Sequence, residues 1–513
     1  MNLSKSQYVR GQQCIKSLWL KKNNANVLTV ADESAQVAFE TGNIVGRYAC
    51  KLFPGGEDIP FHGTTFQEKI ELTQQHIKNG VNDIYEATFE YDGILVMVDI
   101  LHRTEEGWEI YEVKSSTKVS DVYIDDASVQ YYVVKGAGLD VRKVSIVHLN
   151  SQYVRASEKI DVEQLFTKQD VTSKIIDKQD EIPSHLRTFK TFLDDKTNEP
   201  NIDIGAHCTK PYLCDAYEYC WKTQKNIPDY SVFNIFNMGK KPIELYNLGI
   251  VNVVDIPEEY LTTEKQKLVV DAYKHNRQII DKDSIRYFLG SLTYPIYHFD
   301  FETFQQAVPE FKGTRPYQQI PFQYSLHIEH KDGKLKHLEF LGNENGDPRE
   351  DLIKSMINNI PKGATVMVFN ESFEKTRIKE LAIDFPQYTK ELLNIRDGIV
   401  DLATPFSQKH YYHPDLKGKY SIKVVLPHLV PEMAKAYKEL ELVQHGGDAM
   451  NTFPRLKEMN KEQCELYKDA LLKYCELDTY AMVRVLDKLR ELVSTGIKIK
   501  IADKTKLNHS KKG

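Results

Sequence analysis

Apolar and polar residues between positions 83 and 114 alternate with a period close to two, which predicts a group of β-strands. Thr64–Asn79 and a segment that begins at Asp125 are instead predicted as helices. The first part of the chain is therefore expected to mix strands and helices. The three predicted strands are Ile84–Phe89, the nearly all-apolar Ile94–Leu101, and Trp108–Lys114.

The second half of the chain shows a similar mixture. Tyr297–Thr303 is an apolar run that carries acids, and Gln319–His330 and Leu335–Leu341 alternate like paired strands. Ala364–Phe369 is predicted as a buried strand that leads into a helix, and about Lys461–Leu492 as a long helix. These patterns predict four parts: an α/β domain over 1–225, a helical bridge over 226–290, a second α/β domain over 291–495, and a flexible basic tail over 496–513.

Composition narrows the class of protein. At 513 residues the chain is long enough for two to four domains, and its 41% hydrophobic and 27% charged residues are ordinary for a globular protein. A run of eighteen apolar residues and a signal-peptide core are both missing from the sequence, so we expect a cytoplasmic protein that does not enter membranes. The net charge of −6 decides little about nucleic acid, because nucleases gather acids at their metal sites and bases along the substrate path.

Two pairs of residues in the second half predict shared faces. Asp300 and Glu302 are two apart in a predicted strand, so both carboxylates point to one side. Such a pair is either solvated on the surface or held by Mg²⁺ or Mn²⁺, which prefer oxygen ligands. Tyr474 and Asp478 are four apart in the long helix and share one of its faces.

A further acid is expected between these two pairs. Asn370 can cap the helix that follows the strand Ala364–Phe369, and this would place Glu374 in about its first turn. Asp401 is the rival for the same fourth carboxylate position.

Together these residues resemble the three motifs of the DEDD 3′→5′ exonucleases, which have a ribonuclease H-like fold. Asp300 and Glu302 match the first motif, Asn370, Phe373 and Glu374 the second, with Glu in place of the usual Asp, and Tyr474 and Asp478 the third, in its tyrosine form. The resemblance implies two Mg²⁺ or Mn²⁺ ions on Asp300, Glu302, Glu374 (or Asp401) and Asp478, with Tyr474 orienting the attacking water. Lys419 and Lys423 lie in a segment that resembles the part of this family near the substrate, although lysines there are more often solvated.

The first half carries a second group of charged residues. Asp99 ends the apolar strand, and Glu112 and Lys114 share one face of the next. This arrangement resembles the core of PD-(D/E)XK nucleases of the RecB type, as do Gln130 on the following helix and Glu86 before the strand of Asp99. The resemblance implies Mg²⁺ on Asp99 and Glu112, with Glu86 as a further acid of the site. Lys114 would orient or deprotonate water, or stabilise charge on phosphate. The histidine that many of these enzymes carry on an early helix is replaced by Val45-Gly46.

The seven cysteines, an odd number, argue against a disulfide scaffold, and three of them fall within thirteen residues. Cys14 precedes the first domain's core, and Cys208, Cys214 and Cys220 follow it, as in the RecB-like iron–sulfur nucleases. Four thiolates suit a [4Fe–4S] cluster or, as the alternative, Zn²⁺. Cys50, Cys464 and Cys475 stand alone and are predicted core residues.

The whole chain resembles a bacterial family of unassigned function in which a RecB-like PD-(D/E)XK iron–sulfur nuclease domain precedes a DEDD-type ribonuclease H-like domain. The resemblance implies a restriction-endonuclease-like mixed sheet, a helical bridge and a ribonuclease H-like α/β domain. The bridge, around Lys240–Pro257, is either a helix-hairpin-helix that contacts phosphate or a plain spacer.

The function implied is metal-dependent hydrolysis of phosphodiester bonds in DNA, with RNA as an open alternative and two separate nuclease sites. A second hypothesis is a nucleic-acid binding module with one or both sites inactive, and a third is a scaffold held by zinc. A Walker lysine loop is missing from the sequence, so we expect no nucleotide-driven motor in this chain. Protein partners stay open.

Overall fold

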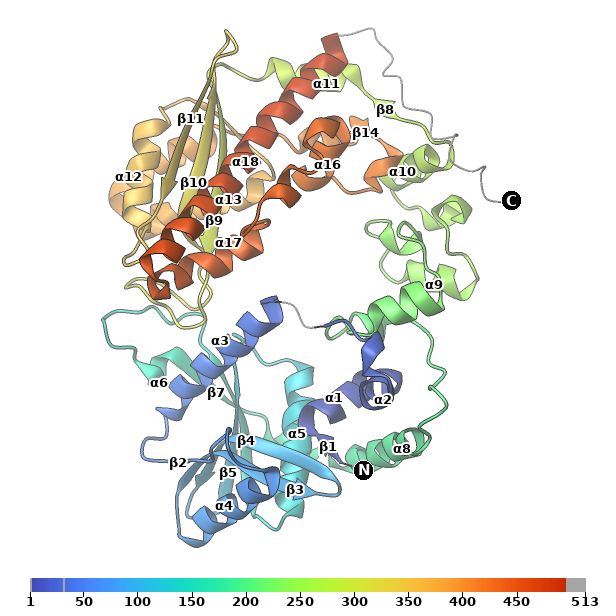
Figure 1. The fold of residues 1–513 in the computed structure, drawn as a ribbon, viewed down its shortest axis with the longest axis vertical. Coiled ribbons are helices and arrows are strands. Elements are labelled where there is room, and N and C mark those ends of the chain that lie inside the picture. The colour runs from blue at the N-terminus through green and yellow to red at the C-terminus, as the bar shows by residue number, and fades with distance from the viewer. Residues whose placement is uncertain (1, 31–32, 495–513) are drawn as a thin grey trace. The chain divides into compact units, whose positions relative to one another are not determined.

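The computed structural model describes residues 2–30 and 33–494 (Figure 1). The predicted basic tail over 496–513 lies outside the described residues. The described chain forms an α/β protein with two compact units, each built around its own mixed sheet. Unit 1 comprises Met1–Phe233, Gly239–Asn252 and Phe304–Ile320, and unit 2 comprises Asn234–Met238, Val253–Thr303 and Pro321–Gly513.

The sheet of unit 1 has the strand order β2-β3-β4-β5-β6-β7, with β1 paired to β4. β3, β4 and β5 are antiparallel neighbours, and they confirm the three strands predicted from alternation. β5 and β6 are parallel, so the chain crosses over between them through α5. The strands are β1 Leu3–Ser4, β2 Glu57–Asp58, β3 Asp83–Tyr91, β4 Ile94–Arg103, β5 Trp108–Lys114, β6 Val141–Leu149 and β7 Phe166–Asp170.

Helices surround this sheet, and two of them begin at capping boxes. Ser4 and Gln7 cap α1, and Thr65 and Glu68 cap α4, in each case satisfying backbone N–H groups at the first turn. The buried face of α5 packs with β3, β4 and β6 into one apolar core. The helices are α1 Lys5–Gln13, α2 Ile15–Asn23, α3 Glu33–Cys50, α4 Phe66–Lys78, α5 Asp121–Gly136, α6 Val162–Leu165, α7 Thr172–Ile176 and α8 Ile182–Asp194.

The predicted bridge is less helical than expected. α9, Lys241–Asn247, ends before Gly249, whose positive φ of 79° suits a helix terminus. The next element is a short 3₁₀ turn, Val253–Asp255, where a helix-hairpin-helix would have its second helix. The helix α10, Glu264–Lys274, follows, and the short strand β8, Ile279–Ile280, comes after it.

The sheet of unit 2 has the order β11-β10-β9-β12-β13 and is also mixed, because β10 and β11 are antiparallel whereas β9, β12 and β13 run parallel. These strands confirm the predicted strands of the second half. Their bounds are β9 Ile296–Phe304, β10 Ile320–Glu329, β11 Leu335–Leu341, β12 Thr365–Val368 and β13 Ile399–Asp401.

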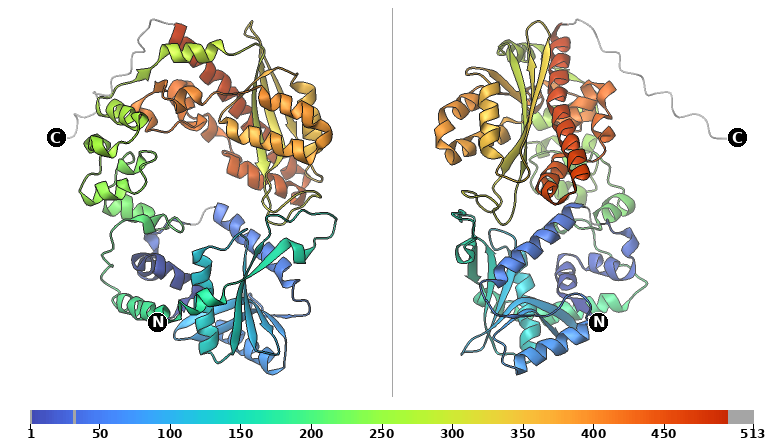
Figure 2. Two further views of the ribbon diagram at one scale, coloured as in Figure 1. Left: turned by 180° about the vertical axis from the view of Figure 1, so that it is seen from behind. Right: turned by 60° about the vertical axis from the view of Figure 1, so that its left-hand side comes forward.

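Helices cover both faces of this sheet. α12 Arg349–Asn359, α13 Glu371–Asp384 and α14 Thr389–Asp397 bury apolar side chains against one face. The long α18, Lys461–Ser494, lies on the other face, as Figure 2 shows, and confirms the predicted long helix. The shorter elements on its side are α10 Glu264–Lys274, α11 Lys282–Gly290, α15 Thr404–Ser407, β14 Tyr411–Tyr412, α16 Ile422–Leu429 and α17 Gly446–Thr452.

The alternation of β10 decides how α18 is attached. Tyr324, Leu326 and Ile328 point into the apolar core beneath α12–α14. The intervening residues are polar and bond to α18. Gln323 Nε2 donates to the Leu471 carbonyl at 2.7 Å, Ser325 Oγ lies 2.6 Å from Thr479 Oγ1, and Arg490 Nη1 lies 2.6 Å from Glu329 Oε1. We call these three contacts the β10–α18 ladder.

Among the described residues, none of the helices is both long and apolar enough to cross a membrane.

The close approach of Gly398 to the start of β12 yields a test of the fold. A Cβ at Gly398 would lie 2.3 Å from the Ala364 carbonyl oxygen, a backbone atom that cannot rotate away. We expect Gly398→Ala to lower the free energy of unfolding by about 1–3 kcal/mol, measured as a lower thermal midpoint by circular dichroism. Gly346→Ala is the control, because a Cβ there meets nothing within 4 Å. Equal midpoints for the two variants would contradict this packing.

Candidate functional site

Four acids from three elements of unit 2 meet on the α18 side of its sheet. Asp300 and Glu302 lie on β9, Glu374 on α13 and Asp478 on α18. Glu302, Glu374 and Asp478 are buried. The pKa of Asp300 lies well above its usual range, first because of burial and then because Asp478, Glu302 and Glu374 repel its charge. We call Asp300, Glu302, Glu374 and Asp478 the carboxylate site.

Burial raises the pKa of all four groups, and repulsion by the neighbouring acids adds to the shift at Asp300 and Glu302. The pKa of Glu302 is raised well above its ordinary value by burial and by Asp478, and burial raises that of Asp478. Burial also raises the pKa of Glu374, to about 8. Lys423 on α16 opposes these shifts at Glu302 and Asp478. Because the charged forms are disfavoured, the arrangement is one that a divalent cation would stabilise.

The structure separates the two candidates for the fourth acid. Asp401 Oδ1 accepts hydrogen bonds from the backbone N–H groups of Asn370 at 2.9 Å and Ala403 at 2.8 Å, so it holds a turn together. Glu374 Oε2 is buried and has no hydrogen-bond partner among the described residues. Glu374 also repels Asp300 directly. Glu374 is therefore the acid that faces the other three.

Asn370 occupies the N-cap position of α13, but the side-chain cap expected there is wrong. Its backbone has a left-handed φ of 82°, and its side chain makes no capping hydrogen bond to α13. The Asn370 N–H donates instead to Asp401 Oδ1. Glu374 nevertheless lies in the first turn of α13, as predicted.

Two tyrosines and a lysine enclose Asp478. Tyr437 donates its hydroxyl to Asp478 Oδ1 at 2.5 Å, and Lys423 Nζ lies 3.3 Å from the Tyr474 hydroxyl oxygen. The Lys423 ammonium also lies 4.8 Å and 4.9 Å from the ring centroids of Tyr437 and Tyr474. Burial and the charge of Asp478 raise the pKa of both phenols, so both stay protonated. Tyr437 was not predicted, because it lies in a short 3₁₀ turn without a motif.

Gly446, the first residue of α17, borders this site. A Cβ there would lie 3.6 Å from Glu302 Oε2 and 3.9 Å from the Tyr474 hydroxyl. Cys475 is buried, as predicted, and its Sγ groups with the acids of β9 within 4.8 Å. Burial and then Asp300 raise the pKa of this thiol well above its ordinary value, so it is a poor ligand at neutral pH.

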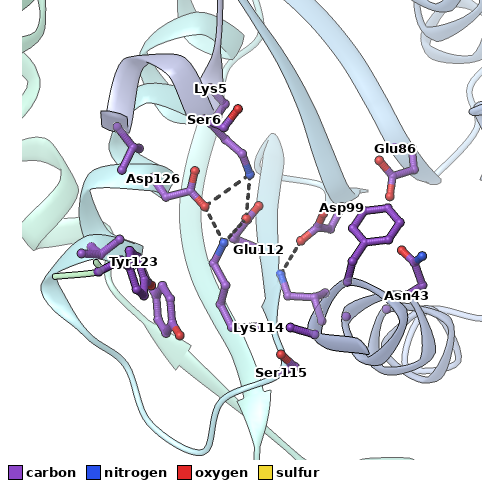
Figure 3. A pocket seen from close by; sticks show the side chains of 18 of the residues that line it. Lys5, Ser6, Asn43, Glu86, Asp99, Glu112, Lys114, Ser115, Tyr123 and Asp126 are labelled. Atoms are coloured by element: carbon purple, nitrogen blue, oxygen red, sulfur yellow. Dashed lines mark hydrogen bonds and ion pairs between the residues drawn. The ribbon is translucent and has the colours of Figure 1, made fainter. Parts of the chain in front are cut away.

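A second site lies in unit 1, at a cavity of about 1140 Å³. Glu86, Asp99 and Glu112 come from the adjacent strands β3, β4 and β5 and point into this cavity (Figure 3). Glu86 has a left-handed φ of 57°, and it is the one residue of β3 from Asp83 to Tyr91 that does not pair with β4, opposite Asp99, although the register is the same on both sides of it. Its side chain lines the cavity.

Glu112 is the most heavily bonded of these acids. Its Oε1 accepts from Lys114 at 2.6 Å and Lys5 at 2.7 Å, and its Oε2 accepts from Gln130. Both lysines also pair with Asp126 on α5 (Figure 3). The structure therefore brings together the predicted residues Glu112, Lys114 and Gln130.

Charge is distributed unevenly over this second site. Burial opposes ionisation of Glu112, but Lys114 and Lys5 outweigh it and hold the pKa of Glu112 well below its usual range. Burial raises the pKa of Asp99 and of Glu86, and Glu112 adds to both shifts. Lys5 offsets both shifts only in part, so Asp99 and Glu86 are less well compensated by the nearby lysines than Glu112.

Sequence reasoning missed Lys5 and Asp126. Asp126 lies four residues before Gln130 on α5, and this spacing could have revealed it. Lys5 carries no such signal, because tertiary contacts, the pairing of β1 with β4 and the packing of α1 on α5, bring the start of α1 to the acids. Asn43 of α3 lies on the Glu86 side of the cavity in Figure 3, on the helix that also carries Val45-Gly46.

The four predicted ligand cysteines converge in unit 1. Cys14 stands between α1 and α2, and a small pocket is lined by it together with Cys208, Cys214 and Cys220. Arg10 forms a two-pronged ion pair with Asp215, next to Cys214, at 2.7 Å and 2.8 Å. Gln13 donates to the carbonyls of His207 and Tyr212. The loop that carries Cys208 and Cys214, with Cys220 after it, is therefore fixed to α1, the helix that ends next to Cys14.

Comparisons with known proteins identify relatives without an assigned activity. A family profile described as a domain of unknown function (DUF2779) matches residues 297–421. The uncharacterized protein UU173 of Ureaplasma parvum serovar 3 is 28% identical over 298 residues, covering 53% of this chain and 42% of that protein. The uncharacterized protein MG366 of Mycoplasma genitalium is 26% identical over 294 residues, covering 54% and 42%. The matches span less than half the length of these curated relatives, and no solved structure matches significantly.

The pKa of Glu374 predicts how stability depends on pH when chelator is present. The folded chain holds this proton up to about pH 8, whereas the unfolded chain releases it near pH 4.3. The unfolded state binds fewer protons between these values, so stability should fall as pH rises through that window and level off above it. Glu374→Gln should reduce the fall in thermal midpoint between pH 5 and 8. The exposed control Glu391→Gln should keep it, and an unchanged slope for Glu374→Gln would refute the shift.

Proposed function

We propose that the carboxylate site of unit 2 hydrolyses phosphodiester bonds of nucleic acid from the 3′ end with two Mg²⁺ or Mn²⁺ ions. The observation that carries the proposal is the burial of Asp300, Glu302, Glu374 and Asp478 together, with every pKa raised. Oxygen-only ligands suit these hard cations, and the unpartnered Oε2 of Glu374 fits the same purpose. A ribonuclease H-like fold for unit 2 is part of this proposal, supported by the mixed sheet with β9 beside β10 and β12.

The ions, when bound, activate water and stabilise the departing oxygen. The protein's own residues do the rest. Tyr474 orients the attacking water through its neutral hydroxyl, because a phenol with a raised pKa is a donor rather than a base. Lys423 supplies the positive charge beside Tyr474, and Tyr437 fixes the carboxylate of Asp478. Gly446 leaves room above Glu302, where a side chain would crowd a substrate.

We further propose that the cavity of unit 1 is a second nuclease site of the PD-(D/E)XK type, with metal on Asp99, Glu112 and Glu86. Lys114 is placed to stabilise negative charge that develops on phosphate. The cavity is also lined by exposed rings of Phe39, Phe61 and Tyr212, on which bases of a single strand could stack. DNA is the expected substrate, and RNA is the alternative.

Site-directed variants test the two-site proposal. Asp300→Asn should abolish stepwise, metal-dependent shortening from the 3′ end of end-labelled single-stranded DNA or RNA. Lys114→Ala should lower a second cleavage activity about 10²–10³-fold, as loss of one charge-stabilising group does. The assay uses Mg²⁺, Mn²⁺ or chelator, with labels at each end and protein purified without oxygen.

Matched surface variants serve as controls for this assay. Asp397→Asn on α14 and Lys174→Ala on α7 change the same residue types at exposed positions and should cleave like wild type. If Asp300→Asn and Lys114→Ala lose the same activity to the same extent, the two-site proposal is wrong.

We propose a [4Fe–4S] cluster on Cys14, Cys208, Cys214 and Cys220. The four cysteines, which all belong to the described residues, line one pocket. No three of their sulfur atoms lie within 4.8 Å of one another. Tetrahedral zinc with Zn–S bonds of about 2.3 Å would need sulfurs about 3.8 Å apart. The wider spacing supports a cluster of four separate irons, each taking one thiolate, over a single zinc ion that would take all four. Its role would be to hold α1 and α2 to the loop that carries the other three cysteines.

Colour and metal content test the cluster. Protein purified without oxygen should be brown, absorb broadly near ~400 nm and contain about four iron atoms per chain. Cys14→Ser should lose both colour and iron, whereas Cys50→Ser should keep them, because Cys50 lines the other cavity. The cluster would be contradicted if the wild-type protein were colourless and contained one zinc ion that Cys14→Ser lacks.

A binding module with inactive sites is the alternative function. The observation that favours it is the engagement of Glu112 by both Lys5 and Lys114, which leaves less need for a cation in unit 1. This alternative expects the wild-type protein to bind the labelled strands without metal-dependent cleavage.

A further inference from the structure

A third cluster of polar side chains lies in unit 2, formed by His327 on β10, His337 on β11 and Glu476 on α18. One ring nitrogen of each histidine and one carboxylate oxygen all lie within 4.8 Å of one another. The two rings are stacked with centroids 4.5 Å apart, and His337 Nδ1 lies 3.8 Å from Glu476 Oε1. We call these three residues the His–His–Glu cluster.

One arrangement of protons satisfies all the hydrogen bonds around the cluster together, and it assigns the proton of each ring to one nitrogen. Thr479 Oγ1 donates its single proton to the Glu476 carbonyl at 3.1 Å, so it can only accept from its other neighbours. Those neighbours are His327 Nδ1 at 2.8 Å and Ser325 Oγ at 2.6 Å. The Ser325 hydroxyl, having donated, must accept from His337 Nε2 at 2.9 Å.

Both histidines therefore present a lone pair on the nitrogen that the network does not use. His327 is protonated at Nδ1 and has its lone pair on Nε2, and His337 is protonated at Nε2 and has its lone pair on Nδ1. The pKa of His327 supports this state, because burial and the neighbouring His337 lower it to about 3 and keep the ring neutral. Neutral imidazoles with the remote nitrogen held by a hydrogen bond are the usual form of histidine ligands to metals.

We infer that His327, His337 and Glu476 form a binding site for a divalent transition metal of the zinc type, separate from the carboxylate site. Two imidazoles and one carboxylate are a common ligand set for Zn²⁺, with a fourth position open to water. The ligand atoms must close from 4.8 Å or less to about 3.3 Å, the spacing of atoms 2.0–2.1 Å from one ion. Glu476 can supply this movement, because about half of its side chain is exposed.

Because of the position of Glu476, an ion bound there would also connect parts of unit 2. Glu476 lies between Tyr474 and Asp478 on α18, on the face that meets β10 and β11. An ion held there would add a bond between the β10–β11 hairpin and the helix that carries the acid and the tyrosine of the carboxylate site. It would act together with the β10–α18 ladder, in which Ser325 and Thr479 already take part.

Zinc content under controlled conditions tests the inference. Full-length protein is dialysed against buffered Zn²⁺ with excess Mg²⁺, which fills oxygen-ligand sites, and bound zinc is measured by mass spectrometry. Wild type should bind one more equivalent of zinc per chain than His337→Ala or Glu476→Gln. Zinc that other groups bind, such as the cysteines or His413, Asp415 and His428, is the same in all variants and cancels in the difference.

His330→Ala is the matched control, because His330 is an exposed histidine at the turn of the same hairpin and should keep the full zinc content. Ser325→Ala, which removes the acceptor for His337 Nε2, should weaken zinc binding about 10–100-fold without abolishing it. Zinc should also raise the thermal midpoint of wild type and not that of Glu476→Gln, whose fold is checked by circular dichroism. Equal zinc contents in wild type, His337→Ala and Glu476→Gln would overturn the inference, whatever the nuclease assays show.

Discussion

Burial of like charges is the constraint on which unit 2 depends. Four carboxylates face one another from β9, α13 and α18, and burial raises the pKa of each, so the site resists formation unless something holds these elements in place. The β10–α18 ladder supplies part of that support through side chains that satisfy one another away from water. The apolar face of β10 thus packs into the core, and its polar face fixes the helix that carries Asp478.

Unit 1 solves a related problem in a different way. Its acids also lie on neighbouring strands, but lysines from β5 and from the start of α1 neutralise Glu112, and Asp126 completes the network. The same N-terminal helix ends at Cys14, so the chain's first residues contribute both to the acid site and to the cysteine pocket. α1 therefore connects the cysteine pocket directly to the acids of unit 1.

The His–His–Glu cluster and the carboxylate site use opposite chemistry on the same helix. Among the described residues, no donor neutralises all four acids of the carboxylate site. In the cluster, by contrast, each histidine has one ring nitrogen held by a hydroxyl and a lone pair on the other nitrogen. The first arrangement suits hard cations with oxygen ligands, and the second suits softer ones. Different faces of one turn of α18 can thus select different ions without sharing ligands.

Local pattern was enough to determine much of this protein. Alternation predicted the strands that carry Asp99, Glu112, Asp300 and Glu302, and helical spacing predicted that Tyr474 and Asp478 share a face, because these periods follow from backbone geometry alone. The tertiary structure decided which distant groups meet these residues. Lys5 reaches Glu112 across more than a hundred positions, Tyr437 reaches Asp478 from an irregular turn, and Glu374 rather than Asp401 faces Asp300. Such pairings depend on the packing of whole elements, and no local period records them.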